Sequence, residues 1–147
     1  MIIQIAKVED VPDLVNFSRQ LHSTSLYRCF GFSNDKVQQI ITDAITGDPK
    51  QGIVLVAKED GKAVGAVGST VISPFYSSDR VAAEWLWYVE KGQSPKLLLS
   101  LLSGLEYWAK NVADCKAVML GRIKNENTSF RKRGYTATET TLIKELK

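Results

Sequence analysis

The spacing of apolar residues along the first half of the chain predicts alternating strands and helices. An apolar run over residues 2–6 indicates a strand, and helical spacing follows over 7–22 and 33–46, where Ser33 is a suitable N-cap. Two β-prone runs flank Asp60 and Gly61, a pair typical of a tight antiparallel hairpin. Residues 82–90 are rich in aromatic and branched side chains, so we expect a strand there, at the centre of the sheet.

The second half of the chain contains the clearest helical pattern. Apolar residues recur at helical spacing from residue 96 onward, at Leu98, Leu101, Leu102, Leu105, Trp108, Ala109 and Val112. Ser94 is a suitable N-cap because a proline follows it at the first helical position. We then expect a strand over 116–123, a short helix or turn over 125–134 and a last strand over 135–146. The pattern therefore predicts a mixed α+β fold, with a mostly antiparallel central sheet flanked by helices.

Three small residues, Gly65, Ala66 and Gly68, lie on the second arm of the predicted hairpin. Small side chains in a strand allow another element to approach closely. They are equally consistent with a bulged or tightly packed strand, and the sequence leaves both alternatives open.

Composition places limits on the protein class. The 147 residues, of which 44% are hydrophobic and 24% charged, are typical of one globular domain spanning 1–147. A net charge of +3 does not require a nucleic acid or an anionic membrane as partner. Cys29 and Cys115 suggest neither a disulfide framework nor a zinc site, and a single histidine, His22, excludes a multi-histidine metal centre. With no leader or membrane-spanning run in the sequence, we expect a cytoplasmic protein.

Two features of nucleotide-binding proteins bear on the partner that the sequence predicts. The chain has no glycine-rich loop of the kind that binds nucleotide phosphates. Aromatic residues on the predicted strand 82–90 and on the following helix could form a stacking platform for single strands, but core packing fits their positions better. The sequence therefore predicts no nucleic-acid partner.

Four segments carry a resemblance to a known family. They are IAKVEDVPDLVNF (5–17), EWLWYVE (84–90), LLLSLLSGLEYWAK (97–110) and FRKRGYTATETTLIKEL (130–146). In this order, nearly the whole chain resembles the GNAT superfamily of N-acetyltransferases. The ending also resembles small acetyltransferase-like proteins of bacteriophages, for which the cytoplasm would be that of the host.

The resemblance implies acetyl-CoA as cosubstrate. It assigns the edge of the strand at Trp87, Tyr88 and Val89 to the pantetheine, and the helix start at Gln93, Ser94, Lys96 and Leu97 to the pyrophosphate, because helix N-termini bind anions. The family motif is Gln or Arg, two residues, Gly, one residue, then Gly or Ala. Gln93 matches, but Lys96 and Leu98 stand where small residues belong, and Pro95 removes an amide donor. A simple capped helix start is the alternative for this loop.

The resemblance also implies candidate residues around the reacting group. Asn125 is assigned near the pantetheine. Phe130 occupies the position, four residues before Gly134, where the family has a tyrosine that acts as the general acid for the leaving thiolate. Phe130 is therefore expected at the cofactor without a proton to donate, and either Tyr88 or Tyr135 could replace that tyrosine.

Glu84 is the candidate general base. Alternation along the strand places it on the same face as Leu86 and Tyr88, where desolvation would raise its pKa. The alternative is a solvated glutamate at a strand end.

The predicted function is transfer of the acetyl group of acetyl-CoA to an amine by direct attack. The acceptor is an amine on a small molecule or a protein, with specificity expected from segments 23–32 and 73–80, and family members often form homodimers. The alternative is a protein that has kept the fold, lost the activity and serves as a binding or structural component, for example of a phage.

Overall fold

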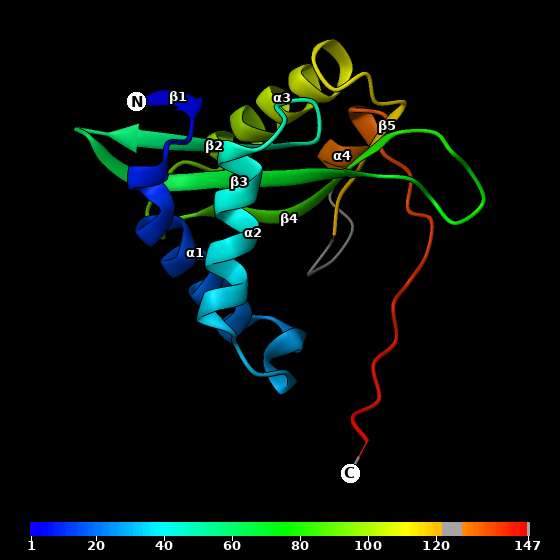
Figure 1. Cartoon of the computed structure of the whole chain (residues 1–147), viewed down its shortest axis with the longest axis horizontal. Coiled ribbons are helices and arrows are strands. Elements are labelled where there is room, and N and C mark those ends of the chain that lie inside the picture. The colour runs from blue at the N-terminus through cyan, green and yellow to red at the C-terminus, as the bar shows by residue number, and fades with distance from the viewer. Residues whose placement is uncertain (122–127, 147) are drawn as a thin grey trace.

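The computed structural model describes residues 1–121 and 128–146 of the chain, and Figure 1 shows their arrangement. Five strands form one sheet in the order β1 (Ile2–Ile5), β2 (Gly52–Glu59), β3 (Lys62–Ile72), β4 (Val81–Val89) and β5 (Ala117–Met119). The first four strands are antiparallel to their neighbours, and β5 is parallel to β4. The α-helices are α1 (Val11–Thr24), α2 (Asn34–Thr46), α3 (Pro95–Asn111) and α4 (Thr128–Lys132), with single 3-10 turns η1 (Val8–Asp10) and η2 (Leu26–Cys29).

The helices cover both faces of the sheet, with α1 and α2 on one face and α3 on the other (Figure 1). The α1–α2 face has a core built from the apolar positions that predicted those helices, with Leu14, Phe17 and Ile41 buried against Val54, Val56 and Leu86. The α3 face is packed by the leucines of that helix, Leu97, Leu101, Leu102 and Leu105. Each helix therefore buries its apolar stripe against a strand face whose residues alternate between the two cores.

The β2–β3 hairpin has the tight turn that its sequence predicts. Asp60 and Gly61 both adopt positive φ, 50° and 78°, which is the geometry that a two-residue turn requires and that Asp and Gly tolerate best. Gly68 on β3 lies directly beneath the ring of Trp85, and the β3–β4 register shifts between Gly68 and Ser69. Close approach and a bulge therefore occur together on this arm.

Two predictions about the sheet are wrong. β4 lies between β3 and β5, one strand from the end of the sheet and not at its centre. No strand forms over 135–146, although β-branched residues predicted one. A strand needs a neighbour to satisfy its backbone, so β-prone composition without pairing leaves an extended segment. β5 extends over three residues of the predicted 116–123, of which 122 and 123 lie outside the described residues.

Candidate active site

β4 and β5 run side by side only at the beginning of β4. Val81 pairs with Ala117, Ala82 with Val118 and Ala83 with Met119, and no later residue of β4 pairs with a described residue of β5. Trp85–Val89 therefore has a strand neighbour on the β3 side only, within the described part of the chain. The other edge of this half of β4 carries backbone groups that an extended ligand could pair with.

Glu84 is the first residue of β4 beyond the part that pairs with β5. Its Oε2 accepts a hydrogen bond from the backbone amide of Gly121, two residues after β5, at 3.0 Å. Burial raises the pKa of the Glu84 carboxyl to about 7, although the Gly121 amide acts in the opposite direction by favouring the carboxylate. A carboxyl that titrates near neutrality is suited to taking and giving up a proton at physiological pH.

The face occupied by Glu84 differs from the predicted one. Glu84 lies opposite Ser69 of β3, and Leu86 lies opposite Gly68, so Trp85 is one extra residue without an opposite partner. This β-bulge breaks the alternation, because Trp85 and Leu86 are consecutive yet both pack in the α1–α2 core. Cross-strand partners share a face, and Val67 and Val71, two positions either side of Ser69, pack in the α3 core. Glu84 is therefore on the α3 face, opposite to Leu86 and Tyr88.

Tyr88 belongs to the α1–α2 face. Its ring centroid lies 5.0 Å from that of Phe17, and its hydroxyl donates to Gln20 Oε1 of α1 at 2.7 Å. Burial raises the pKa of this phenol, as does the nearby charge of Glu90. Tyr88 and Glu84 thus lie on opposite faces of β4, which weakens the case for Tyr88 as the acid.

The side chains of Trp85–Val89, which we call the open half of β4, anchor this segment to the helices. Trp87 and Val89 pack in the α3 core, and the Trp87 indole donates to the carbonyl of Leu98 at 3.1 Å. The Phe130 ring of α4 meets Trp87 edge-on, with centroids 5.6 Å apart. Phe130 therefore contacts the strand that the resemblance assigns to the pantetheine.

Tyr135 forms part of a polar cluster between α3 and the chain after α4. Its hydroxyl donates to Glu106 Oε1 at 2.9 Å, and Arg133 bonds to Glu106 Oε2 at 2.6 Å. Burial raises the pKa of the Tyr135 phenol well above its ordinary value, and the adjacent Glu106 carboxylate raises it further. The phenolic proton is thus held by Glu106, so the hydrogen bond of Tyr135 joins the chain after α4 to α3 and leaves no proton for the leaving group.

The start of α3 is capped from within. Ser94 is the N-cap as predicted, and its Oγ accepts from the Lys96 amide at 3.3 Å, while its carbonyl accepts from the Leu97 amide at 2.9 Å. The Leu97 side chain is buried in the α3 core, and Pro95 has no amide hydrogen. The Gln93 side chain donates to Glu59 at 3.3 Å. Several donors assigned to the pyrophosphate therefore have partners inside the protein.

Three donors remain at this helix start. The amides of Gly92 and Ser94 have no hydrogen-bond partner among the described residues, and the Lys96 side chain is exposed. Gly92 adopts a positive φ of 95°, with nothing within 4 Å of where a Cβ would stand. The loop can therefore present two amides and an ammonium group to an anion at the positive end of a 17-residue helix.

Solved structures share this architecture. No protein-family model matches the sequence, and no curated protein matches it either. A predicted acetyltransferase from Clostridium acetobutylicum, solved with acetyl-CoA, superposes with a TM-score of 0.75 at 16% identity, covering 98% of this chain and 95% of that one. Glucosamine-6-phosphate N-acetyltransferase from Arabidopsis thaliana gives 0.74 at 14% identity, covering 99% of this chain and 98% of that one. An acetyltransferase from Trypanosoma brucei gives 0.71 at 15% identity, covering 99% of both chains.

The chain has the GNAT acetyltransferase fold. Identities of 14–16% establish the fold alone, so the activity has to be argued from the site. The resemblance to phage proteins stays a prediction. Asn125, which the resemblance places near the pantetheine, lies outside the described residues.

The sequence does not indicate two parts of the candidate site. One is the Gly121 amide that binds Glu84, which no local pattern indicates because the contact spans 37 residues. The other is the group of small and hydroxyl residues opposite the bulge, for which the cluster at 65–68 was a partial signal.

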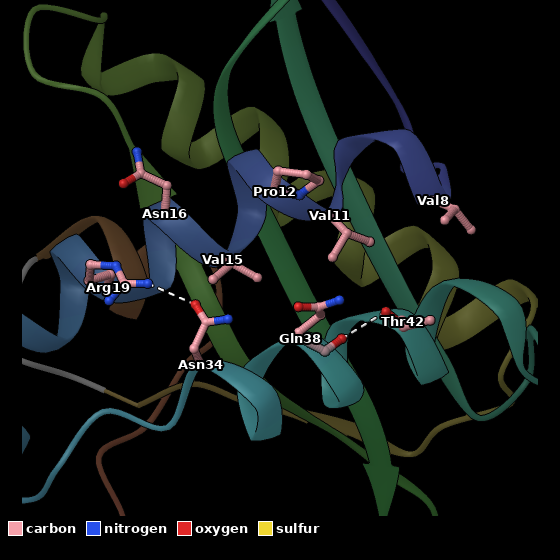
Figure 2. A pocket seen from close by; sticks show the side chains of 9 residues that line it. All are labelled: Val8, Val11, Pro12, Val15, Asn16, Arg19, Asn34, Gln38 and Thr42. Carbon is pink, nitrogen blue, oxygen red and sulfur yellow. Dashed lines mark hydrogen bonds between the residues drawn. The ribbon is translucent and has the colours of Figure 1, made fainter.

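A groove with a volume of about 560 Å³ lies elsewhere, between α1 and α2 (Figure 2). Val11 and Val15 of α1 and Gln38 and Thr42 of α2 are among its lining residues, and Arg19 donates to Asn34 at one end at 2.8 Å. None of the site residues predicted from the sequence lines it. In the part of the chain that the structure describes, no helix is both long and apolar enough to span a membrane.

Proposed function

We propose that the protein is an acetyl-CoA-dependent N-acyltransferase in which a substrate amine attacks the acetyl group directly and Glu84 is the general base. The observation that carries the proposal is the position of Glu84, a half-buried carboxyl whose pKa is raised to about 7, at the point where β4 and β5 cease to pair among the described residues. The GNAT fold of solved acetyltransferases supports it.

The described residues fit two parts of acetyl-CoA, the pantetheine and the pyrophosphate. The free backbone edge of Trp85–Val89 would hold the pantetheine by strand-like pairing. The amides of Gly92 and Ser94 and the Lys96 side chain would bind the pyrophosphate. When bound, acetyl-CoA supplies an activated thioester carbonyl.

Glu84 would act on the acceptor. As carboxylate it would accept a proton from the amine as nitrogen bonds to the acetyl carbon, while the carbon–sulfur bond of the thioester breaks and CoA leaves as a thiolate that takes a proton from solvent. The Gly121 amide would hold Oε2 in place during this step. A pKa near 7 keeps about half of the carboxyls ionised at neutral pH, so the base is available without being too weak to accept a proton.

The acceptor would be an amine on a small molecule or a protein. The two segments assigned to specificity present exposed aromatic side chains, Tyr27 and Phe30 in the first and Phe75 and Tyr76 in the second. Phe75 and Tyr76 are each 94% exposed and contact one another edge-on, so they offer an apolar contact to an incoming substrate. A homodimer and a cytoplasmic location remain predictions.

Calorimetric titration with acetyl-CoA and, separately, with desulfo-CoA tests cofactor binding. We expect saturable heat with a micromolar Kd, about −8 kcal/mol, for both ligands. Lys96→Gln should weaken both, and the matched exposed control Lys36→Gln on α2 should leave both unchanged. Binding followed by acetylation of an amine panel supports the proposal, and binding without turnover of any amine contradicts the enzyme assignment.

A second function is favoured by a specific observation. Ser94 satisfies the first amides of α3 from within, Pro95 removes one donor, and Phe130 stands where the GNAT resemblance expects a tyrosine. These features fit a protein that has kept the fold and lost the cofactor, and that serves as a binding or structural component. Absence of heat with either ligand up to millimolar concentration would favour this second function.

A further inference from the structure

The β-bulge at Trp85 separates the face of Glu84 from the face of Leu86 and Tyr88. Before the bulge, Ala82 packs in the α3 core, and after it, Leu86 packs in the α1–α2 core. In an unbroken strand, residues 82, 84, 86 and 88 would share one face, and a shift of one residue would exchange the faces. Glu84 alternates regularly with Ala82 and so faces α3, where it meets the Gly121 amide, and the extra residue inserted directly after Glu84 turns Leu86 and Tyr88 to the opposite face.

Gly68 of β3 provides the space for that extra residue. The six-membered part of the Trp85 indole lies against it, and a Cβ built on Gly68 would be 2.5 Å from the ring. Side chains do not tolerate such a distance, so any residue larger than glycine at position 68 would displace the indole. The ring that fills the bulge therefore depends on the absence of a side chain opposite it.

Two hydroxyl groups of β3 fix the backbone and the indole around the bulge. Thr70 Oγ1 accepts a hydrogen bond from Trp85 Nε1 at 2.9 Å. Ser69, which is completely buried, donates from Oγ to the carbonyl of Ala83, the residue before Glu84, at 3.0 Å. A buried polar group that loses its partner destabilises the fold, so both contacts favour this register over one without the bulge.

We propose that Gly68, Ser69 and Thr70 are positioning residues, which hold the bulge at Trp85 and thereby keep Glu84 on the α3 face, where β5 ends, while Leu86 and Tyr88 pack on the opposite face. We call these three residues the bulge support. The inference deepens the proposed function, on which it rests for the catalytic role of Glu84. The placement of Glu84 by the bulge support can be tested whether or not the protein is an enzyme.

Three variants test the bulge support. Thr70→Val removes only the acceptor of the indole hydrogen bond, Thr70→Ser retains it, and Gly68→Ala inserts a methyl group into the ring position. Thr46→Val on the exposed side of α2 is the matched control, because its hydroxyl bonds only to the preceding helical turn. The readouts are the carboxyl carbon resonance of Glu84 against pH, the Trp85 indole proton resonance, and kcat and KM for acetyl transfer.

We expect the titration midpoint of Glu84 to move by about one pH unit or more in Gly68→Ala and by a smaller amount in Thr70→Val. A misplaced base should lower kcat by about tenfold to 100-fold in Gly68→Ala, with KM for acetyl-CoA nearly unchanged. Thr70→Ser should show the wild-type titration midpoint of Glu84, and Thr46→Val should leave that midpoint unchanged.

Two outcomes separate this inference from others. The positioning role would be overturned if Gly68→Ala and Thr70→Val both fold and keep the wild-type titration midpoint of Glu84. This holds even if both variants are less stable, because residues with a structural role alone would change the stability and not the midpoint. If Gly68→Ala fails to fold, the titration midpoints of Glu84 in Thr70→Val and Thr70→Ser provide the test. A wild type without acetyl transfer would remove the proposed function, while a moved midpoint would still support the positioning role.

Discussion

The N-terminal half of β4, Val81–Ala83, pairs with β3 on one side and with β5 on the other, whereas Trp85–Val89 pairs with β3 alone among the described residues. The first half has small side chains and is fixed by its neighbours. The second half is aromatic and is fixed by packing against helices, through Trp87 on one face and Tyr88 on the other. One strand thus combines a rigid part and a part with a free edge, and Glu84 lies between them.

The largest expected effect concerns the residue at that junction. Glu84→Gln keeps an acceptor for the Gly121 amide but cannot take a proton, so kcat should fall by about 10²–10⁴-fold. Steady-state kinetics and acetyl-CoA calorimetry measure the two effects separately, and binding should be unchanged. Glu139→Gln, the same substitution in the exposed tail, is the control. An unaltered kcat in Glu84→Gln would remove Glu84 from the mechanism.

Trp87 is expected to determine the stability of the open half. Trp87→Ala removes the indole hydrogen bond to Leu98 and the edge contact with Phe130, and should lower the free energy of unfolding by about 3 kcal/mol. Urea unfolding of both proteins measures this loss. Tyr107→Ala, at a residue 68% exposed on α3, should cost less than about 0.5 kcal/mol. Equal losses in the two variants would mean that packing of Trp87 does not support the free edge.

The pH dependence of stability should show the burial of Glu84. Its ordinary pKa of 4.5 is raised by burial to about 7, so between these values the unfolded chain ionises while the folded protein keeps the proton. The free energy of unfolding should therefore fall as pH rises through this window, by up to about 3 kcal/mol at about 1.4 kcal/mol per pH unit, and level off above it.

Glu84→Gln removes that ionisation and provides the comparison. The variant and the wild type should be nearly equal in stability at pH 4, and the variant should be the more stable protein at pH 8, as measured by urea unfolding at each pH. A difference between the two proteins that did not change with pH would mean that Glu84 titrates normally in the folded protein.

The smallest expected effect is at Tyr135. Tyr135→Phe removes one hydrogen bond to Glu106, which keeps its ion pair with Arg133, so stability should fall by only about 1 kcal/mol. Because the phenolic proton is held by Glu106, kcat should not change. A tenfold loss of kcat with unchanged cofactor binding would instead identify Tyr135 as the acid.

The sequence predicted most of the fold from local patterns. The helical spacing of apolar residues located α1, α2 and α3 to within a few residues, Ser94 was identified as the N-cap of α3, and Asp60 and Gly61 as the hairpin turn. These features depend on neighbours within a few positions along the chain, so local sequence contains the information. The last strand was mispredicted because β-branched residues show only a preference, and a strand also needs a partner.

The residues of the candidate site stay predictions, and the structure changes part of their geometry. Glu84 has the raised pKa that the sequence predicts, but it lies on the face opposite to the one that alternation predicts. Leu97 was named for the cofactor, yet its side chain belongs to the core.

The sequence by itself therefore determined most of the helices and strands, apart from the last strand, and which carboxyl is the candidate base. Only the tertiary structure decided that β4 leaves β5 after Ala83, that Gly121 reaches Glu84, and that Gly68 allows Trp85 to form the bulge. The physical reason is that propensity and periodicity act between neighbours in sequence, whereas a register shift is fixed by side chains on the adjacent strand. One inserted residue is enough to exchange the faces of everything beyond it.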